Sequence, residues 1–119
     1  MDREHRQALD EREELIEGRA RALAEEAVER SAPWTSHVGA PPNDPTKRRD
    51  WLVAISTVAA YRDRYAVKSA QPLGGPAMTD AQRSDRVRAG YALRQANRIV
   101  ADEHARGYQQ LAAQPLAIR

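Results

Sequence analysis

Four of the seven prolines in this 119-residue chain fall between residues 33 and 45. Proline fixes φ and lacks a backbone N–H donor, so a segment this rich in it fits neither a helix interior nor a central strand. The segment also carries Trp34, one of only two tryptophans in the chain. We therefore predict a rigid loop over residues 31–44, with Trp34 folding back onto a neighbouring helix as the centre of a small core.

A helix is expected directly after this loop, over about residues 45–66. Asp44 is a favoured N-cap, and Pro45 fits the first helical position because the N–H it lacks would have no partner there. Apolar side chains then recur at helical spacing; they are Trp51, Ala54, Ile55, Val58, Tyr61 and Tyr65. We expect Trp34 to pack against this helix beside Trp51.

Two further helices flank this one in the sequence. Residues from about 6 to 30 contain no proline. Their apolar positions recur near helical spacing between positions rich in Glu and Arg, which is typical of an amphipathic helix. Breakers fill residues 67–78, after which Thr79 and Gln82 form a capping box, with Gln82 reaching back to the Thr79 amide. A helix over about residues 80–113 follows. Its apolar stripe consists of Ala89, Ala92, Leu93, Ala96, Ile99 and Val100.

These elements predict the fold class and the domain organisation. We expect an all-α fold: three long helices in an up-down bundle, with the proline-rich loop packed against it. Residues 1–119 would form one helical domain, with residues 114–119 as a short tail after the last helix.

Charge is distributed unevenly along the chain. The first 30 residues carry ten acidic and six basic side chains, a net of −4, whereas residues 31–119 carry seven acidic and thirteen basic ones, a net of +6. The basic side chains that could contact DNA phosphates are Lys47, Arg48, Arg49, Arg62, Arg64, Arg83, Arg86 and Arg88. Two interpretations stay open: these residues bind DNA, or they form ion pairs with the acidic first helix.

The first predicted helix is long for a compact domain of this size. Twenty-five helical residues span about 38 Å, so part of the helix should overhang the core. Its apolar line consists of Leu9, Ile16, Leu23 and Ala27. This line could pair with the same helix of a second copy, giving a homodimer, or be covered within one chain by another helix. Both arrangements remain possible on the sequence.

No catalytic or metal-binding pattern stands out. The chain has no cysteine, and His5, His37 and His104 fall in different elements without metal-ligand spacing. A tyrosine beside arginines could attack a phosphodiester, but Tyr61 and Tyr65 lie four residues apart on the apolar face of a helix, so we interpret them as packing residues. We therefore predict a non-enzymatic protein with no cofactor and no bound metal.

The sequence also lacks a secretory leader and any apolar run long enough to span a bilayer. We accordingly expect a cytoplasmic protein that does not insert into membranes.

A series of short motifs runs from residue 33 to residue 74. The motifs are Pro33-Trp34, Val38-Gly39-x-Pro41-Pro42-x-Asp44-Pro45, Arg48-x-x-Trp51, the run from Thr57 to Tyr65, and Pro72-Leu73-Gly74. The series resembles a segment near the C-terminus of the large conjugative relaxase–helicases of actinobacterial plasmids and integrative elements. The resemblance covers roughly residues 10–90.

The resemblance implies the system to which the chain belongs and does not imply an enzymatic activity of the chain itself. Relaxases of this family nick DNA through an N-terminal domain with a tyrosine nucleophile and a three-histidine metal site, and they unwind it with P-loop motor domains. None of those motifs occurs in this chain. The C-terminal regions of such relaxases are used for recruitment and protein contacts. The resemblance thus implies a non-enzymatic accessory or protein-interaction module of a DNA-transfer complex, with a DNA-binding module as the alternative.

Overall fold

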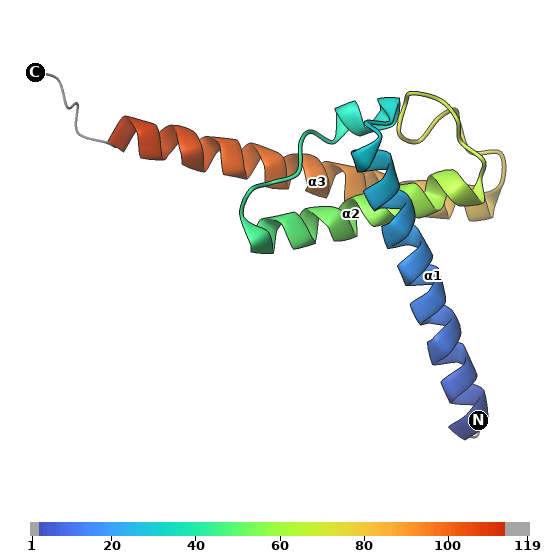
Figure 1. Cartoon of the computed structure of the whole chain (residues 1–119). Coiled ribbons are helices and arrows are strands. Elements are labelled where there is room, and N and C mark those ends of the chain that lie inside the picture. The colour runs from blue at the N-terminus through green and yellow to red at the C-terminus, as the bar shows by residue number, and fades with distance from the viewer. Residues whose placement is uncertain (1–2, 114–119) are drawn as a thin grey trace, which may run out of the picture.

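The computed structural model describes the backbone of residues 3–113 and the side chains of residues 10–107. The elements are helix α1 (Arg3–Glu29), the 3₁₀ helix η1 (Pro33–His37), helix α2 (Pro45–Arg64) and helix α3 (Asp80–Ala113) (Figure 1). No strand occurs in the described part of the chain. The predicted all-α fold with three long helices is confirmed, and each helix lies within a few residues of its expected range.

Helix α2 lies at the centre of the arrangement. Helix α3 runs antiparallel along it, and α1 packs across it obliquely, so that the N-terminal half of α1 projects beyond the other two helices (Figure 1). The Cα radius of gyration is 18.1 Å, whereas a compact domain of this length has about 13.5 Å. Figure 1 shows that the expected overhang of the first helix contributes to this extended shape.

The core forms where the proline-rich loop meets α2. Trp34 and Trp51 belong to one buried cluster and are only 5% and 2% exposed, which confirms that Trp34 packs onto this helix. The Trp51 indole N–H donates to the Val38 carbonyl at 3.2 Å, so the buried ring has no unsatisfied donor. The other members of the cluster are mostly small; they are Ala24, Ala27, Ala32, Val38, Ala54, Ile55, Val58, Ala59 and Ala96.

Capping side chains begin the last two helices. The Asp44 carboxylate accepts a hydrogen bond from the Lys47 amide at 3.0 Å, as expected of an N-cap. The Thr79 hydroxyl accepts one from the Gln82 amide at 3.0 Å. The Gln82 side chain, however, accepts a hydrogen bond from the Met78 amide and not from the Thr79 amide. The return contact of the predicted capping box is therefore made one residue earlier than expected.

Two contacts hold the end of the proline-rich loop against α3. Gly39 adopts a φ of +76°, which L-residues rarely adopt, and a Cβ there would lie 3.2 Å from the nearest side-chain carbon of Val100. Further along, the Glu103 carboxylate accepts hydrogen bonds from the Asn43 amide at 2.9 and 3.0 Å and from the Asp44 amide at 3.2 Å. The loop therefore packs on both long helices of the body.

We expect Trp34→Ala to lower the free energy of unfolding by about 3–5 kcal/mol, as truncation of a buried aromatic side chain does. Urea unfolding followed by circular dichroism measures the change. Val53→Ala serves as the control, because Val53 is 53% exposed on α2 and its truncation should cost less than about 0.5 kcal/mol. Equal, small losses in both variants would show that Trp34 is a surface residue.

The Glu103 contacts predict a pH dependence. The amides of Asn43 and Asp44 lower the pKa of the Glu103 carboxyl below its ordinary value of 4.5. A carboxyl with a depressed folded-state pKa stabilises the fold above its ordinary pKa, and this contribution is lost as the pH falls through the lowered value.

We expect Glu103→Gln to make the protein less stable at pH 7 and to flatten its loss of stability between about pH 5 and pH 3. Urea unfolding at a series of pH values measures both effects. Asp102→Asn is the matched control, because Asp102 is an exposed neighbour on the same helix. An acid-side slope that Glu103→Gln leaves at the wild-type value would contradict the role given to these hydrogen bonds.

Candidate functional site

The basic residues selected from the sequence do not form one surface. Lys47, Arg48 and Arg49 lie in the first turn of α2. The other five lie at the opposite end of the antiparallel α2–α3 pair; they are Arg62, Arg64, Arg83, Arg86 and Arg88. The two groups lie 13 to 17 residues apart along α2, so about 20–25 Å separates them. A continuous DNA-binding stripe through all eight is therefore not present.

Two of the three basic residues at the start of α2 face the first helix. Arg48 and Arg49 line a shallow hollow of about 420 Å³ together with Arg21 and Glu25 of α1. The ion pair that joins α1 to α2 has the opposite polarity from the expected one, because Arg19 of α1 binds Asp63 of α2 through two hydrogen bonds of 3.1 Å. The alternative in which Arg62 and Arg64 pair with acidic residues of the first helix is not found among the described side chains.

Arg64 and Arg83 instead have acidic partners near the start of α3. Arg64 lies 3.1 Å from Asp85, and Arg83 lies 2.6 Å from Asp80. Both arginines are about two-thirds exposed, so these pairs are solvated and each contributes at most about 1 kcal/mol. The pairs nevertheless offset part of the positive charge that the sequence places at this end.

The two tyrosines of α2 are held by polar contacts to α3. Tyr61 is 4% exposed and its hydroxyl accepts a hydrogen bond from the Gln82 amide group at 3.2 Å. The Tyr65 hydroxyl donates to Asp85 at 2.5 Å, and this hydrogen bond, together with burial, raises the pKa of Tyr65 above its ordinary value. A raised pKa opposes the phenolate that a nucleophile needs, so the geometry favours the packing interpretation.

An exposed aromatic ring lies among arginines on the outer side of α3. The Tyr91 face, as we define it, consists of Arg83, Arg86, Val87, Tyr91 and Arg94, which border a hollow of about 300 Å³. Tyr91 is 65% exposed, and the Arg94 guanidinium lies 4.7 Å from its ring centroid. The buried Nε of Arg86 has no hydrogen-bond partner in the described structure. The sequence analysis missed Tyr91 and Arg94, although their spacing from Val87 places them on one helix face.

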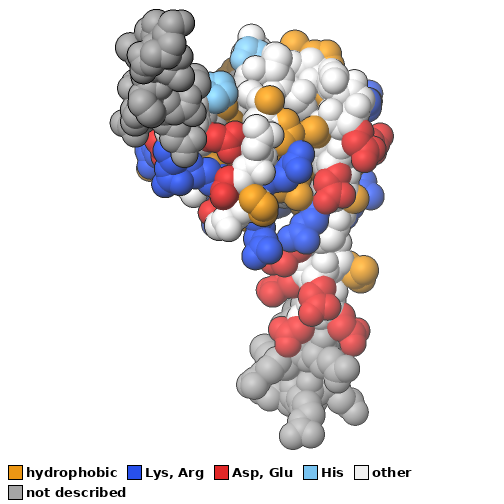
Figure 2. Space-filling model, turned by 60° about the vertical axis from the view of Figure 1, so that its left-hand side comes forward, with side chains coloured by type: hydrophobic (Ala, Val, Ile, Leu, Met, Phe, Trp, Pro, Cys, Tyr) orange, Lys and Arg blue, Asp and Glu red, His pale blue; other side chains and the backbone are white. Residues whose placement is uncertain are grey.

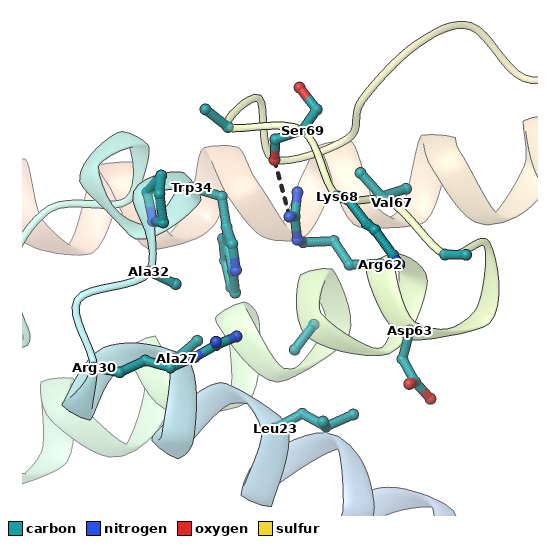
Figure 3. Close-up of a pocket in the computed structure, with 14 residues that line it drawn as sticks. Leu23, Ala27, Arg30, Ala32, Trp34, Arg62, Asp63, Val67, Lys68 and Ser69 are labelled. Atoms are coloured by element: carbon teal, nitrogen blue, oxygen red, sulfur yellow. Dashed lines mark hydrogen bonds between the residues drawn. The ribbon is translucent and has the colours of Figure 1, made fainter.

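A larger hollow, here called the Trp34 hollow, opens between the end of α1, η1, the end of α2 and the loop after it (Figure 3). Its volume is about 720 Å³, and three cationic side chains line it: Arg30, Arg62 and Lys68. The Arg62 guanidinium lies 5.2 Å from the Trp34 ring centroid, a cation–π distance. It also donates hydrogen bonds of 2.9–3.1 Å to loop carbonyl groups, those of Ser69, Gln71 and Pro72.

The residues predicted to form a self-association line lie in two different environments along helix α1. Ala27 is buried at 3% exposure and Leu23 packs against the same core, so this half of the line is covered within one chain. Ile16 is 58% exposed, and the side chain of Leu9 lies outside the described residues. Of the two arrangements that the sequence leaves open, covering within one chain applies at Leu23 and Ala27, and pairing with a second copy stays a prediction for the exposed part of the line.

Residues 10–19 form a stalk in which every side chain is exposed. The stalk carries five acidic residues and two arginines, a net charge of −3. Figure 2 shows these acidic side chains gathered on the projecting helix, with lysine and arginine side chains over the adjoining body. Leu15, at 75% exposure, stands beside Ile16 on this acidic stalk.

No group of three or more potential metal ligands occurs among the side chains that the structure describes. His37 and His104 are both exposed, and the His5 side chain lies outside the described range. Within that same range, no helix has both the length and the apolar character needed to cross a bilayer. No protein-family model matches the chain, and neither a curated protein nor a solved structure matches it.

Proposed function

We propose that this chain is a non-enzymatic protein-interaction module of a conjugative DNA-transfer system and that the α1 stalk is its docking element. The observation that carries the proposal is the exposed pair Leu15 and Ile16 on a helix that leaves the body of the protein. Ile16 continues a line that is covered within the chain at Ala20 and Leu23, so the apolar stripe runs from the core out onto the stalk.

The stalk has the character of a helix that binds another helix. Leu15 and Ile16 are large apolar side chains left in water, and burying them against a partner would return roughly 25 cal/mol per Å² of apolar surface. The acidic residues around them favour a partner segment of positive charge; they are Asp10, Glu11, Glu13, Glu14 and Glu17. An amphipathic basic helix satisfies both requirements.

The setting is supported by the resemblance to relaxase C-terminal segments. The residues that carry that resemblance build the core: Trp34, Val38 and Trp51 are buried together, and Gly39 makes the close approach to α3. The likeness therefore concerns the body that positions the stalk. A relaxase of the same conjugative element is the partner we propose.

The test is copurification with that relaxase. The chain and a tagged relaxase from the same conjugative element are produced together, and the wild-type chain should be retained. Leu15→Glu combined with Ile16→Glu should reduce retention at least about tenfold, because two buried apolar contacts would be replaced by charges facing an apolar surface. Analytical ultracentrifugation of the chain alone determines whether a second copy occupies the stalk instead.

Met78→Glu is the matched control, because Met78 is 82% exposed, close to the 75% of Leu15, yet belongs neither to the stalk nor to the Tyr91 face. Retention that is equally reduced by both variants would show that the stalk is not the docking element. A wild-type chain that the relaxase does not retain, or a dimer that the Leu15 and Ile16 changes separate, would overturn the proposed partner.

A second candidate function, binding of DNA, is favoured by the Tyr91 face. Bases stack on exposed aromatic rings, and arginines contact the phosphates between them. The Arg94 guanidinium already lies over the Tyr91 ring. Arg86, whose Nε has no partner in the described structure, borders the same hollow. This arrangement fits a single strand better than a duplex, whose bases are already stacked.

Fluorescence anisotropy with a labelled single-stranded oligonucleotide tests this candidate. Three arginine–phosphate contacts predict that log K falls against log salt concentration with a slope of about −2. Tyr91→Ala and Arg94→Ala should each weaken binding at least about fivefold. Arg48→Ala, at the other end of the body, should leave affinity almost unchanged. Equal weakening by Arg48→Ala, or affinity independent of salt, would rule the Tyr91 face out.

A further inference from the structure

The Trp34 hollow carries more positive charge than its surroundings offset. Arg30, Arg62 and Lys68 all line it. Asp63 also lies at its edge, but that carboxylate is bound to Arg19 on the outer side, and Figure 3 shows it directed away from Trp34. Among the described residues, neither Arg30 nor Lys68 has an acidic partner. Three cations therefore share a hollow of about 720 Å³ without a neutralising side chain.

Arg62 is a fixed part of this hollow and keeps donors available. A guanidinium has five N–H donors, and three of them are used on the Ser69, Gln71 and Pro72 carbonyl groups. Its ring contact with Trp34 further restrains its position. Arg30 lines the same hollow as Arg62, and partial burial together with the positive charge of Arg30 lowers the pKa of Arg62. An anion between them would relieve that repulsion.

Most of the remaining wall of the hollow is apolar. Leu23 and Ala27 of α1 and Ala59 of α2 border it on the side opposite the loop. The volume lies within the range of small-molecule sites, which are mainly apolar with a few placed polar groups. A ligand that fills this space would thus combine one strongly anionic group with an apolar or aromatic body.

We propose that the Trp34 hollow binds a small molecule that bears a phosphate monoester and an aromatic or apolar group. The phosphate lies between Arg30 and Arg62, with Lys68 as the third cation, and the apolar group lies against Leu23 and Ala27. A phosphate monoester carries close to two negative charges at neutral pH, and arginine binds it through paired N–H donors. This site is independent of the stalk and of the Tyr91 face.

The two tryptophans make the test specific, since the indole N–H of each gives its own nuclear magnetic resonance signal. Phenyl phosphate is titrated into the ¹⁵N-labelled wild-type chain at pH 7.5. The Trp34 signal should shift and saturate, whereas the Trp51 signal should stay in place, because Trp51 donates to the Val38 carbonyl and does not line the hollow. Titration at pH 5.5, where the phosphate is mostly singly charged, should give weaker binding.

Arg30→Gln and Lys68→Gln should each raise the dissociation constant for phenyl phosphate, Arg30→Gln by about tenfold or more. Neither side chain has a hydrogen bond to other described residues, so both variants should fold. Arg88→Gln, an exposed arginine on α3, is the matched control and should bind as the wild type does. Indole signals that shift together, an effect of Arg88→Gln equal to that of Arg30→Gln, or no saturable shift at all would each overturn the proposal.

Discussion

The stacking of the Arg62 guanidinium on the Trp34 indole is the contact on which the rest of this structure depends. The chain has no phenylalanine and its core is rich in alanine, so the two tryptophans supply much of the large apolar surface that folding buries. Trp34 brings the proline-rich loop onto α2, and Arg62 covers that indole while it binds the carbonyl groups of the loop after α2. One charged side chain thus holds two loops at the same end of one helix. An apolar side chain could cover the ring, but it would offer those carbonyl groups no donors.

Local rules predicted the helices well because the helix ends carry local signals. Asp44 and Pro45 mark the start of α2, and the Thr79 hydroxyl marks the start of α3. The same rules could not identify Glu103, whose amide partner at Asn43 lies 60 residues earlier in the chain. Helical periodicity indicates which face of a helix is apolar, but it does not indicate which exposed carboxylate will meet the N–H groups of a distant loop. The oblique crossing of α1 over α2 could not be predicted from the sequence for the same reason, because it depends on how the surfaces of two helices fit together.

Basic residues show the corresponding limit for the candidate sites. A sequence shows how many arginines a helix carries, but the partners that offset their charge come from other elements. Arg64 is paired with Asp85 of α3, whereas Arg30 and Lys68, which the sequence analysis did not select, face a hollow with no acidic partner among the described residues. Selecting residues by charge alone therefore included arginines that already form ion pairs within the fold, such as Arg64. It omitted Arg30 and Lys68, which have no acidic partner among the described residues. Tyr91 was omitted because an exposed aromatic ring cannot be told from a buried one by spacing when half of the helix is covered.

Helix α1 lies in two environments, and this division explains why only part of the predicted apolar line is covered within the chain. From Ala20 onward its small apolar residues pack against the core, and close packing there needs small side chains because α1 crosses the middle of α2. Before Ala20 the helix has left the body. Leu15 and Ile16 are nevertheless large apolar side chains that lie exposed to solvent. An apolar line that is mostly covered by the core at one end and left exposed at Leu15 and Ile16 fits a helix that is anchored at one end and binds a second surface at the other. The charge pattern agrees with this division, because the acidic residues gather on the exposed half and Arg19 anchors the boundary to Asp63.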